Sequence, residues 1–371
     1  TVVSMPVRAM SPILQSLTSK AVQKRGPEQC QPELQQSARR VMHDLGLAAT
    51  EDVVWSQIIE LGWLLVSLPE NMGGLEAGIK GAAIMHSELG RGLSTAPYLP
   101  AMLAADIISQ SQADARDQLL ESLISGELIT TPLADSDITL SDNRITGTAI
   151  AVQAADQARQ ILVATSAGEC IVLIEPAQTG VEIIPTPTWD QTRNLFEVQL
   201  TDIELSKQIV LAEGLSAVEL TRRMYSLRDF ALSADAIGGA NALLELTVEH
   251  LQSRVQFKRP LAMFQALKHR CANLKTSVLA AEAMLSAALA DATALDSNTA
   301  RTHAMAAKCC ATSMFSSLAE DCLQLHGGIG MADEHPCHLF LKRALLNNHL
   351  SGENNAYATA IGRSLAQPCR P

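Results

Sequence analysis

Apolar positions in the first third of the chain recur three and four residues apart, from about residue 32 to residue 126. That spacing places apolar side chains on one face of a helix. It is clearest in three segments, residues 38–45, 53–61 and 82–89. We therefore predict an N-terminal helical domain over residues 32–127.

The pattern changes to β-branched runs separated by turn residues between residues 128 and 213. Runs of this kind are typical of short strands. Asp142 and Asn143 mark a hairpin turn, and strands are expected at residues 138–140, 145–146, 161–164, 171–174, 181–184 and 196–200. A small antiparallel β domain over residues 128–213 is the predicted outcome.

Long helical periods return from about residue 217 and cover residues 223–254, 264–292, 300–325 and 336–350. Long helices joined by short turns pack most simply as an antiparallel bundle. We predict a C-terminal four-helix bundle over residues 214–371. The predicted fold class is therefore α+β, in the order helical domain, β domain, helical bundle.

Composition narrows the function classes. A chain of 371 residues with 47% hydrophobic content can bury a large core in two or three domains. Its net charge of -11 disfavours nucleic acid and anionic membranes as general partners. Because a membrane span needs about 18 consecutive apolar residues and no run approaches that length, no transmembrane helix is expected.

The cysteines and the N-terminal composition bear on localisation. Eight cysteines occur without a CxxC pair, which favours reduced thiols and a cytoplasmic location: Cys30, Cys170, Cys271, Cys309, Cys310, Cys322, Cys337 and Cys369. Residues 1–27 lack acidic side chains and carry Arg8, Lys20, Lys24 and Arg25, as transit peptides do. A leader, a tag remnant and a native extension are all open interpretations of residues 1–31.

Two local motifs carry most of the functional information. Residues 324–330 read Gln-Leu-His-Gly-Gly-Ile-Gly, where glycines either let backbone approach a flat or anionic ligand or supply the positive φ of a tight turn. About 70 residues upstream, Arg254 begins a motif that continues with Gln256, Phe257, Pro260, Phe264 and Gln265. These segments resemble the motifs QxHGGxG and RxxFGxPIxxFQ of the acyl-CoA dehydrogenase family. Residues 60–63, 69–74 and 88–91 resemble the family's N-terminal domain, so the resemblance covers roughly residues 35–366.

The resemblance implies an enzyme that removes a proton beside a thioester carbonyl and passes a hydride from the adjacent carbon to FAD. Arg254 matches the arginine that contacts the FAD pyrophosphate, and a guanidinium suits that group; a helix-end salt bridge is the plain alternative. Gln256 and Phe257 follow the motif, the latter as a packing face for the cofactor or as an ordinary core residue. Lys258 replaces the family's glycine and makes this loop more basic.

The glycine motif carries a second implication. Gln324, Gly327, Gly328 and Gly330 match the segment that, in the family, meets the adenosine half of an FAD bound mainly by a neighbouring subunit. The resemblance therefore implies that cofactor binding takes place at a subunit interface.

The flavin-ring side of the expected site departs from the family. Residues 130–137 resemble a degraded TEPxxGSD segment, with Thr131 in place of glutamate and Asp135 in place of glycine. Residues 147–151 lack the tryptophan that normally precedes flavin-contacting residues. We expect a weakened isoalloxazine site.

The catalytic base is also absent from its family positions. Counting from the motifs, the usual glutamate position holds Ser351, and the alternative position, 26 residues before Arg254, holds Arg228. Two nearby carboxylates, Asp229 and Glu353, are the weak candidates for a displaced base. Because neighbours on a helix are rotated by about 100°, Asp229 is expected to point away from the Arg228 position.

Residues 334–343 and 190–194 resemble a particular branch of the family, the bacterial α2β2 acyl-CoA dehydrogenases, several of which act on steroid CoA esters. In that branch one subunit can lack the base and still complete its partner's FAD site. The first hypothesis is such a subunit, with a homologous partner, an acyl-CoA substrate and electron-transferring flavoprotein as acceptor. A non-catalytic acyl-CoA or partner-binding protein and a self-sufficient homotetramer are the alternatives. No metal site is predicted, and His338 is interpreted as structural or surface because Pro336 separates it from Glu334.

Overall fold

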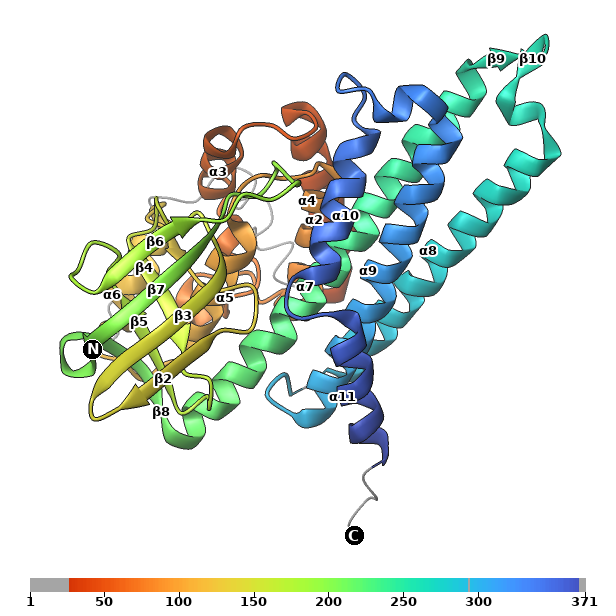
Figure 1. The fold of residues 1–371 in the computed structure, drawn as a ribbon. Helices are drawn as coiled ribbons and strands as arrows, with labels where there is room; N and C mark the ends of the chain where they lie inside the picture. Colours follow the sequence, from red (N-terminus) through yellow and green to blue (C-terminus); the bar gives the residue numbers. More distant parts are fainter. Residues whose placement is uncertain (1–26, 293, 367–371) are drawn as a thin grey trace.

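The computed structural model describes residues 27–292 and 294–366 (Figure 1), so the basic residues of the possible leader lie outside the described part. The N-terminal layer confirms the three predicted helices as α2 (Pro27–Leu45), α3 (Glu51–Glu60) and α4 (Gly78–Arg91). It adds α5 (Tyr98–Gln110), α6 (Arg116–Ile124) and the short 3₁₀ turns η1 (Trp63–Leu65) and η2 (Glu70–Met72). Helix α5 is buried along almost its whole length because it is apolar on most faces.

The middle of the described chain forms two four-stranded sheets. One has the order β1 (Ile129–Thr130), β4 (Gln160–Ala164), β5 (Cys170–Ile174) and β8 (Ile209–Glu213). The other has the order β2 (Asp137–Ser141), β3 (Arg144–Gln153), β7 (Leu195–Glu204) and β6 (Val181–Pro185). The predicted strands are confirmed, but β1 and β8 were not predicted.

The purely antiparallel prediction for this region is wrong at one place, because β1 pairs with β4 in parallel. Strand β1 leads directly from α6 into the sheet, and a pairing between such distant segments leaves no local sequence pattern. The two sheets bury a common apolar core that includes Ile138, Val198, Ile161 and Val172. Alternating side chains from both sheets therefore hold this part of the molecule together.

Long helices dominate the rest of the molecule: α7 (Gly214–Ser253), α8 (Gln265–Asp291), α9 (Asn298–His326), α10 (Cys337–His349) and α11 (Asn354–Ala366). The four predicted helices are confirmed, and α11 is an addition. Figure 1 shows α7, α8 and α9 running side by side, with the hairpin of β9 (Val255–Gln256) and β10 (Arg259–Pro260) at one end. The 3₁₀ turns η4 (Leu261–Met263) and η5 (Gly327–Met331) lie towards that end, while η3 (Leu205–Lys207) precedes β8.

Helix α4 contacts α7 through two glycines. A Cβ at Gly238 would lie 1.9 Å from the Ser87 carbonyl oxygen, and one at Gly90 would lie 2.2 Å from the Asp235 carbonyl oxygen. Only glycine permits backbones to approach this closely. The contact fixes α7 against the N-terminal layer and so positions the residues further along α7.

A buried polar network connects the N-terminal layer, the β region and the bundle. Arg343 of α10 donates to Asp190 at 2.9 Å, to Asp235 at 3.2 Å and to the Ser94 carbonyl oxygen at 2.8 Å. Arg193 pairs with the same Asp235 at 3.3 Å. These buried charges are paired and hydrogen-bonded, as burial requires. Residues 190–194 thus act as an internal cross-link between the β region and helices α7 and α10.

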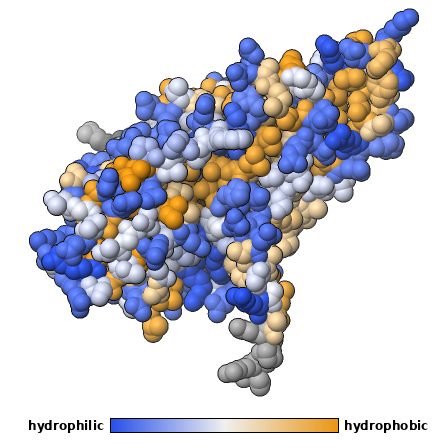
Figure 2. All heavy atoms as spheres, viewed as in Figure 1, coloured by the Kyte–Doolittle hydropathy of each residue, from blue (hydrophilic) through white to orange (hydrophobic). Residues whose placement is uncertain are grey.

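Exposed apolar side chains gather around the end of the bundle that carries the β9–β10 hairpin. Figure 2 shows them as orange and tan atoms among hydrophilic ones, and they include Val255, Phe257, Met263, Ile329 and Met331.

None of the helices in the described ranges is both long and apolar enough to cross a membrane.

Candidate functional site

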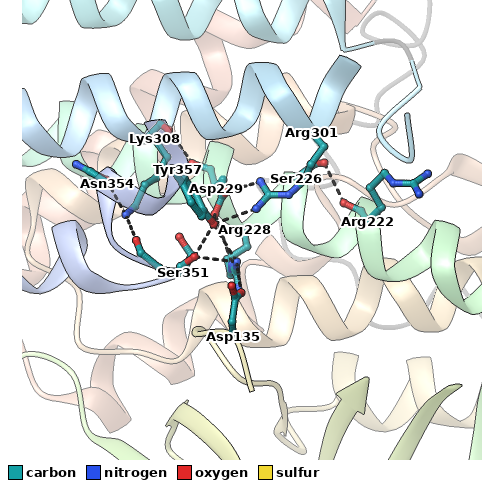
Figure 3. Close-up of polar contacts among 12 residues, drawn as sticks. Asp135, Arg222, Ser226, Arg228, Asp229, Arg301, Lys308, Ser351, Asn354 and Tyr357 are labelled. Carbon is teal, nitrogen blue, oxygen red and sulfur yellow. Dashed lines mark hydrogen bonds and ion pairs between the residues drawn. The ribbon is translucent and has the colours of Figure 1, made fainter. Parts of the chain in front are cut away.

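The two positions expected to hold a catalytic base meet in space. Arg228 lies in the middle of α7, and Ser351 lies in the loop after α10. Both are fully buried, and the Arg228 Nη2 donates to the Ser351 carbonyl oxygen at 3.3 Å (Figure 3). Positions 123 residues apart in sequence therefore point at the same space, and neither side chain is a carboxylate.

Asp229 is fully buried and locked in ion pairs. Its carboxylate pairs with Arg301 of α9, lies 3.5 Å from the Arg228 Nε and accepts from the Tyr357 hydroxyl at 3.3 Å. Burial raises the pKa of Asp229, but Arg301 and Arg228 outweigh burial and leave that pKa below its ordinary value. Although Asp229 was expected to point away from the Arg228 position, its carboxylate lies within reach of the Arg228 side chain.

Tyr357 of α11 joins the members of this buried cluster. Its hydroxyl oxygen accepts from Arg228 at 3.2 Å and from Arg301 at 3.0 Å, and its hydroxyl is also bonded to the Ser351 carbonyl oxygen. Glu353, the other candidate base, is exposed just before α11, so its carboxylate lies at the surface. The structure brings together Arg228, Asp229 and Ser351, and leaves Glu353 outside.

Asp135 and Lys308 belong to the same cluster and were not identified from the sequence as site residues. Asp135 accepts from the Arg228 Nη2 at 3.2 Å, although its side chain is 67% exposed. Lys308 is buried and donates to the carbonyl oxygens of Asn348 and Gly352 and to the Asn354 Oδ1, at 2.8–3.0 Å.

Burial lowers the pKa of Lys308 to about 8. The side chain ties α9 to the last turn of α10, to the loop that carries Ser351 and to the start of α11, through the three oxygen atoms to which it donates. The signal in the sequence was a lysine among the buried alanines Ala304, Ala307 and Ala311 of one helix face.

Two threonines of the segment 130–137, in which Thr131 stands in place of the motif's glutamate, are turned into the protein. Thr130 donates to the Gln153 carbonyl oxygen at 2.7 Å, and Thr131 lies 3.8 Å from the Met224 sulfur. Both threonines are fully buried. Their hydroxyls are therefore engaged by neighbouring protein groups.

The Arg254 motif lies on the β9–β10 hairpin, and Arg254, Gln256 and Phe257 are all exposed. The Phe257 side chain is 86% exposed and meets only the edge of Phe264, with ring centroids 6.1 Å apart. Phe257 and Lys258 both have positive φ, which is uncommon for residues with a Cβ. The hairpin thus presents a cation and an aromatic face to the surroundings.

The glycine motif lies beside this hairpin. His250, one turn before Arg254, stacks on His326 with ring centroids 4.6 Å apart, and Gly327 follows at the end of α9. A Cβ at Gly327 or Gly328 would meet nothing within 4 Å, so this backbone is open to an approaching group.

Gly330 differs from the two glycines before it. A Cβ there would lie 3.0 Å from the His326 Cβ and 3.1 Å from the Leu323 carbonyl oxygen. Close packing within the turn therefore explains this glycine without a ligand. Gln324 is exposed on the last turn of α9.

The groups at this end of the bundle suit the phosphate and adenosine half of a dinucleotide. Arg254 offers a guanidinium, Phe257 an aromatic face, and Gly327 and Gly328 accessible backbone. All of them lie on an exposed surface.

Comparison with known proteins agrees with these motifs. Residues 17–127 match the acyl-CoA dehydrogenase N-terminal domain, and residues 223–366 match the acyl-CoA dehydrogenase C-terminal domain. Acyl-CoA dehydrogenase IpdE2 of Mycobacterium tuberculosis is 32% identical over 297 residues, which are 79% of this chain and 80% of the relative.

Two solved structures share the fold. A chain of the ChsE4-ChsE5 complex from Mycobacterium tuberculosis superposes with a TM-score of 0.80 at 21% identity, covering 92% of this chain and 98% of that chain. A chain of a Tcur3481-Tcur3483 steroid ACAD variant also gives 0.80, at 23% identity, covering 92% and 99%. With both of its terminal domains matched and a curated relative aligned over most of its length, this chain belongs to the acyl-CoA dehydrogenase family.

Proposed function

We propose that this chain is the base-deficient subunit of a heteromeric FAD-dependent acyl-CoA dehydrogenase. It contributes Arg254 and the glycine segment to an FAD that a homologous partner largely holds. The partner supplies the carboxylate that removes the α-proton of the acyl-CoA thioester. FAD, when bound, accepts the hydride.

The cluster around Arg228 and Ser351 is the observation that carries this proposal. A general base needs an available lone pair and a pKa near the working pH. The Asp229 carboxylate is bonded to two guanidinium groups and a phenol, and its pKa is lowered. It is therefore a counter-ion for buried arginines, and it does not fit the role of a proton acceptor.

Three cations also lie around the two positions at which the family resemblance would put a catalytic base. Arg228, Arg301 and Lys308 are paired with Asp229 and Asp135 or with oxygen atoms of the loop that carries Ser351. These contacts engage all three cations, whereas the buried Arg228 Nη1 and Ser351 Oγ have no hydrogen-bond partner among the described residues. In the proposed enzyme the buried cluster of this chain is a structural support, and the acyl-CoA substrate is processed in the partner subunit.

The exposed end of the bundle supports the other part of the proposal. Arg254, Phe257 and the open backbone at Gly327 and Gly328 lie on one surface rather than in a closed pocket. A cofactor shared between two subunits would lie against such a surface of one chain and be covered by the other chain. Two structures of the same fold were solved as assemblies of two named chains, ChsE4-ChsE5 and Tcur3481-Tcur3483.

The substrate class and acceptor follow by similarity. One of these assemblies is described as a steroid ACAD, so we propose a bulky, steroid-type acyl-CoA thioester as the substrate. Electron-transferring flavoprotein is the proposed acceptor, as the family resemblance implies.

Co-expression with a homologous subunit tests the proposal. The chain alone should purify without stoichiometric FAD, whereas the complex should be yellow, contain both chains and oxidise acyl-CoA thioesters. Absence of flavin from every complex would favour a non-catalytic binding protein instead. Full flavin occupancy with turnover by the chain alone would favour a self-sufficient homotetramer.

A further inference from the structure

A second cluster of chemistry-bearing side chains lies apart from the buried arginines. His326 at the end of α9, His335 in the following loop and Cys337 at the start of α10 bring one ligand atom each to within 4.8 Å of the others. The Cys337 sulfur lies 3.6 Å from the His326 Nδ1, on the same ring as the Nε2 that remains to bind an ion. Imidazole nitrogen and thiolate sulfur at this spacing are the ligand types of a borderline-soft divalent ion.

His326 is oriented as a metal ligand is. Its Nδ1 lies 2.8 Å from the Cys322 carbonyl oxygen, and since a carbonyl only accepts, Nδ1 carries the proton. The Nε2 therefore has a free lone pair, yet it is buried and finds no hydrogen-bond partner among the described residues, while the whole residue is only 5% exposed. A buried polar atom without a partner calls for an explanation, and a carbonyl on the opposite nitrogen is the usual support of a ligating histidine.

The other two side chains can join at small cost. Either nitrogen of His335 can ligate only if the Cys337 amide, which donates to its Nδ1 at 3.2 Å, gives up that bond. A neutral hydrogen bond contributes about 1 kcal/mol, much less than a metal–ligand set supplies. His335 is half-buried on the loop between η5 and α10.

The Cys337 thiol is held protonated in the free chain, since burial raises its pKa to about 12. A bound metal ion displaces such a proton outright, and the proton leaves to solvent. Burial lowers the pKa of both His326 and His335, and their neighbouring histidines lower it further, so both rings are neutral bases. The free chain therefore offers two imidazole lone pairs and one ionisable thiol.

We propose that His326, His335 and Cys337 bind one Zn²⁺ ion per chain, with water as the fourth ligand. Two nitrogens and one sulfur favour zinc over magnesium or calcium, which prefer oxygen ligands. Ligand atoms around a tetrahedral zinc lie about 3.3–3.8 Å apart, so the loop must close slightly on binding. The ion would fasten the segment Gly327–Met331 to the start of α10.

Metal titration of the full chain tests this proposal independently of flavin and of any partner. The chain is first freed of metal with a chelator and then titrated with Zn²⁺ or Co²⁺, followed by native mass spectrometry and absorption. Wild type should bind one equivalent, and Co²⁺ should give a thiolate-to-metal charge-transfer band. His335→Gln and Cys337→Ser should each weaken binding at least about tenfold, the effect of losing even a residue that supports a ligand.

Matched controls separate ligation from general surface binding. His338→Gln removes a half-buried histidine near the start of α10, and Cys310→Ser removes an exposed cysteine of α9. Both should bind like wild type, and zinc should raise the thermal midpoint of wild type but not of His335→Gln. No stoichiometric binding by wild type, or equal loss in ligand and control variants, would overturn the proposal.

Discussion

The C-terminal bundle carries two groups of polar residues, and the two groups differ in burial and in pairing. Around Arg228 and Ser351, charged groups are buried and bonded to one another. At the β9–β10 hairpin, Arg254 and Phe257 are exposed, and the nearby Gly327 backbone is uncovered. At the first end the charged groups are paired within one chain, whereas at the second the Arg254 and Phe257 side chains are exposed.

The difference indicates how one family fold can divide its work between chains. A buried charge persists only when it is paired, so an arginine at a base position recruits Asp229 and Asp135 as partners. Those carboxylates are then no longer available for proton transfer. An exposed guanidinium has no such constraint and remains available for a phosphate.

The largest expected effect is on the buried cluster around Arg228 and Ser351. Asp229→Asn leaves Arg228 and Arg301 buried without their shared counter-charge, which should lower the free energy of unfolding by about 3–5 kcal/mol. Urea unfolding measures this. Glu353→Gln, at an exposed carboxylate, should change stability by less than about 0.5 kcal/mol. A stable Asp229→Asn chain whose complex has lost turnover would instead identify Asp229 as a base.

The next effect concerns the exposed surface around Arg254 and Gly327. Arg254→Ala should weaken FAD binding by the complex roughly 10- to 100-fold, because hydrogen bonds to charged groups contribute about 1.5–3 kcal/mol. The free chain should unfold like wild type, since Arg254 is exposed. Flavin retained per complex after gel filtration is the measurement, and Arg40→Ala on α2 is the control. Unchanged flavin retention would remove Arg254 from the proposed site.

A smaller effect distinguishes charged from neutral hydrogen bonds in the core. Tyr357→Phe removes a hydroxyl bonded to Arg228, Arg301 and Asp229, and should cost about 2 kcal/mol. Tyr98→Phe removes one bond to the Trp63 carbonyl oxygen and should cost about 1 kcal/mol. Equal losses in denaturant unfolding would mean that the cluster is not specially dependent on the phenol.

The smallest effect is a pH dependence of the stability that Lys308 contributes in the buried cluster. The pKa of Lys308 is lowered to about 8 from an ordinary value of 10.5, so between these pH values the unfolded chain holds the proton and the folded chain does not. Stability from this group therefore rises with pH across that window and is flat below it.

Lys308→Met removes this titration and serves as the comparison. The unfolding free energy of wild type minus that of Lys308→Met should increase from pH 8 towards pH 10. A difference that stays constant or falls over this range would show that Lys308 is charged in the folded chain throughout.

Periodicity predicted most of the fold because the helices and strands bury regular apolar faces. Strand β8 was missed because Ile209–Glu213 directly precedes α7, and its apolar residues were not separated from the start of the helical pattern. Helix α11 was missed because Tyr357 is its one buried side chain among those described, which leaves almost no apolar period. The β1–β4 pairing is a long-range contact that local pattern does not encode.

The candidate site was predictable only where a residue position could be counted from a motif. Counting located Arg228 and Ser351, and the structure places them together. It gave no sign that Lys308 and Asp135 complete the cluster, because their roles depend on how α9 and the β region pack against α7. The His326, His335 and Cys337 group was missed for the same reason: its members are close only after the loop turns back on α9.

Anaerobic mixing of the chain and added FAD with acyl-CoA thioesters, steroid-type esters among them, in the absence and presence of the homologous partner, tests the central claim most directly. The absorbance band of oxidised flavin is followed with the chain alone and with its homologous partner. The account predicts no bleaching for the chain alone and full bleaching for the complex. Rapid, complete bleaching by this chain on its own would contradict it.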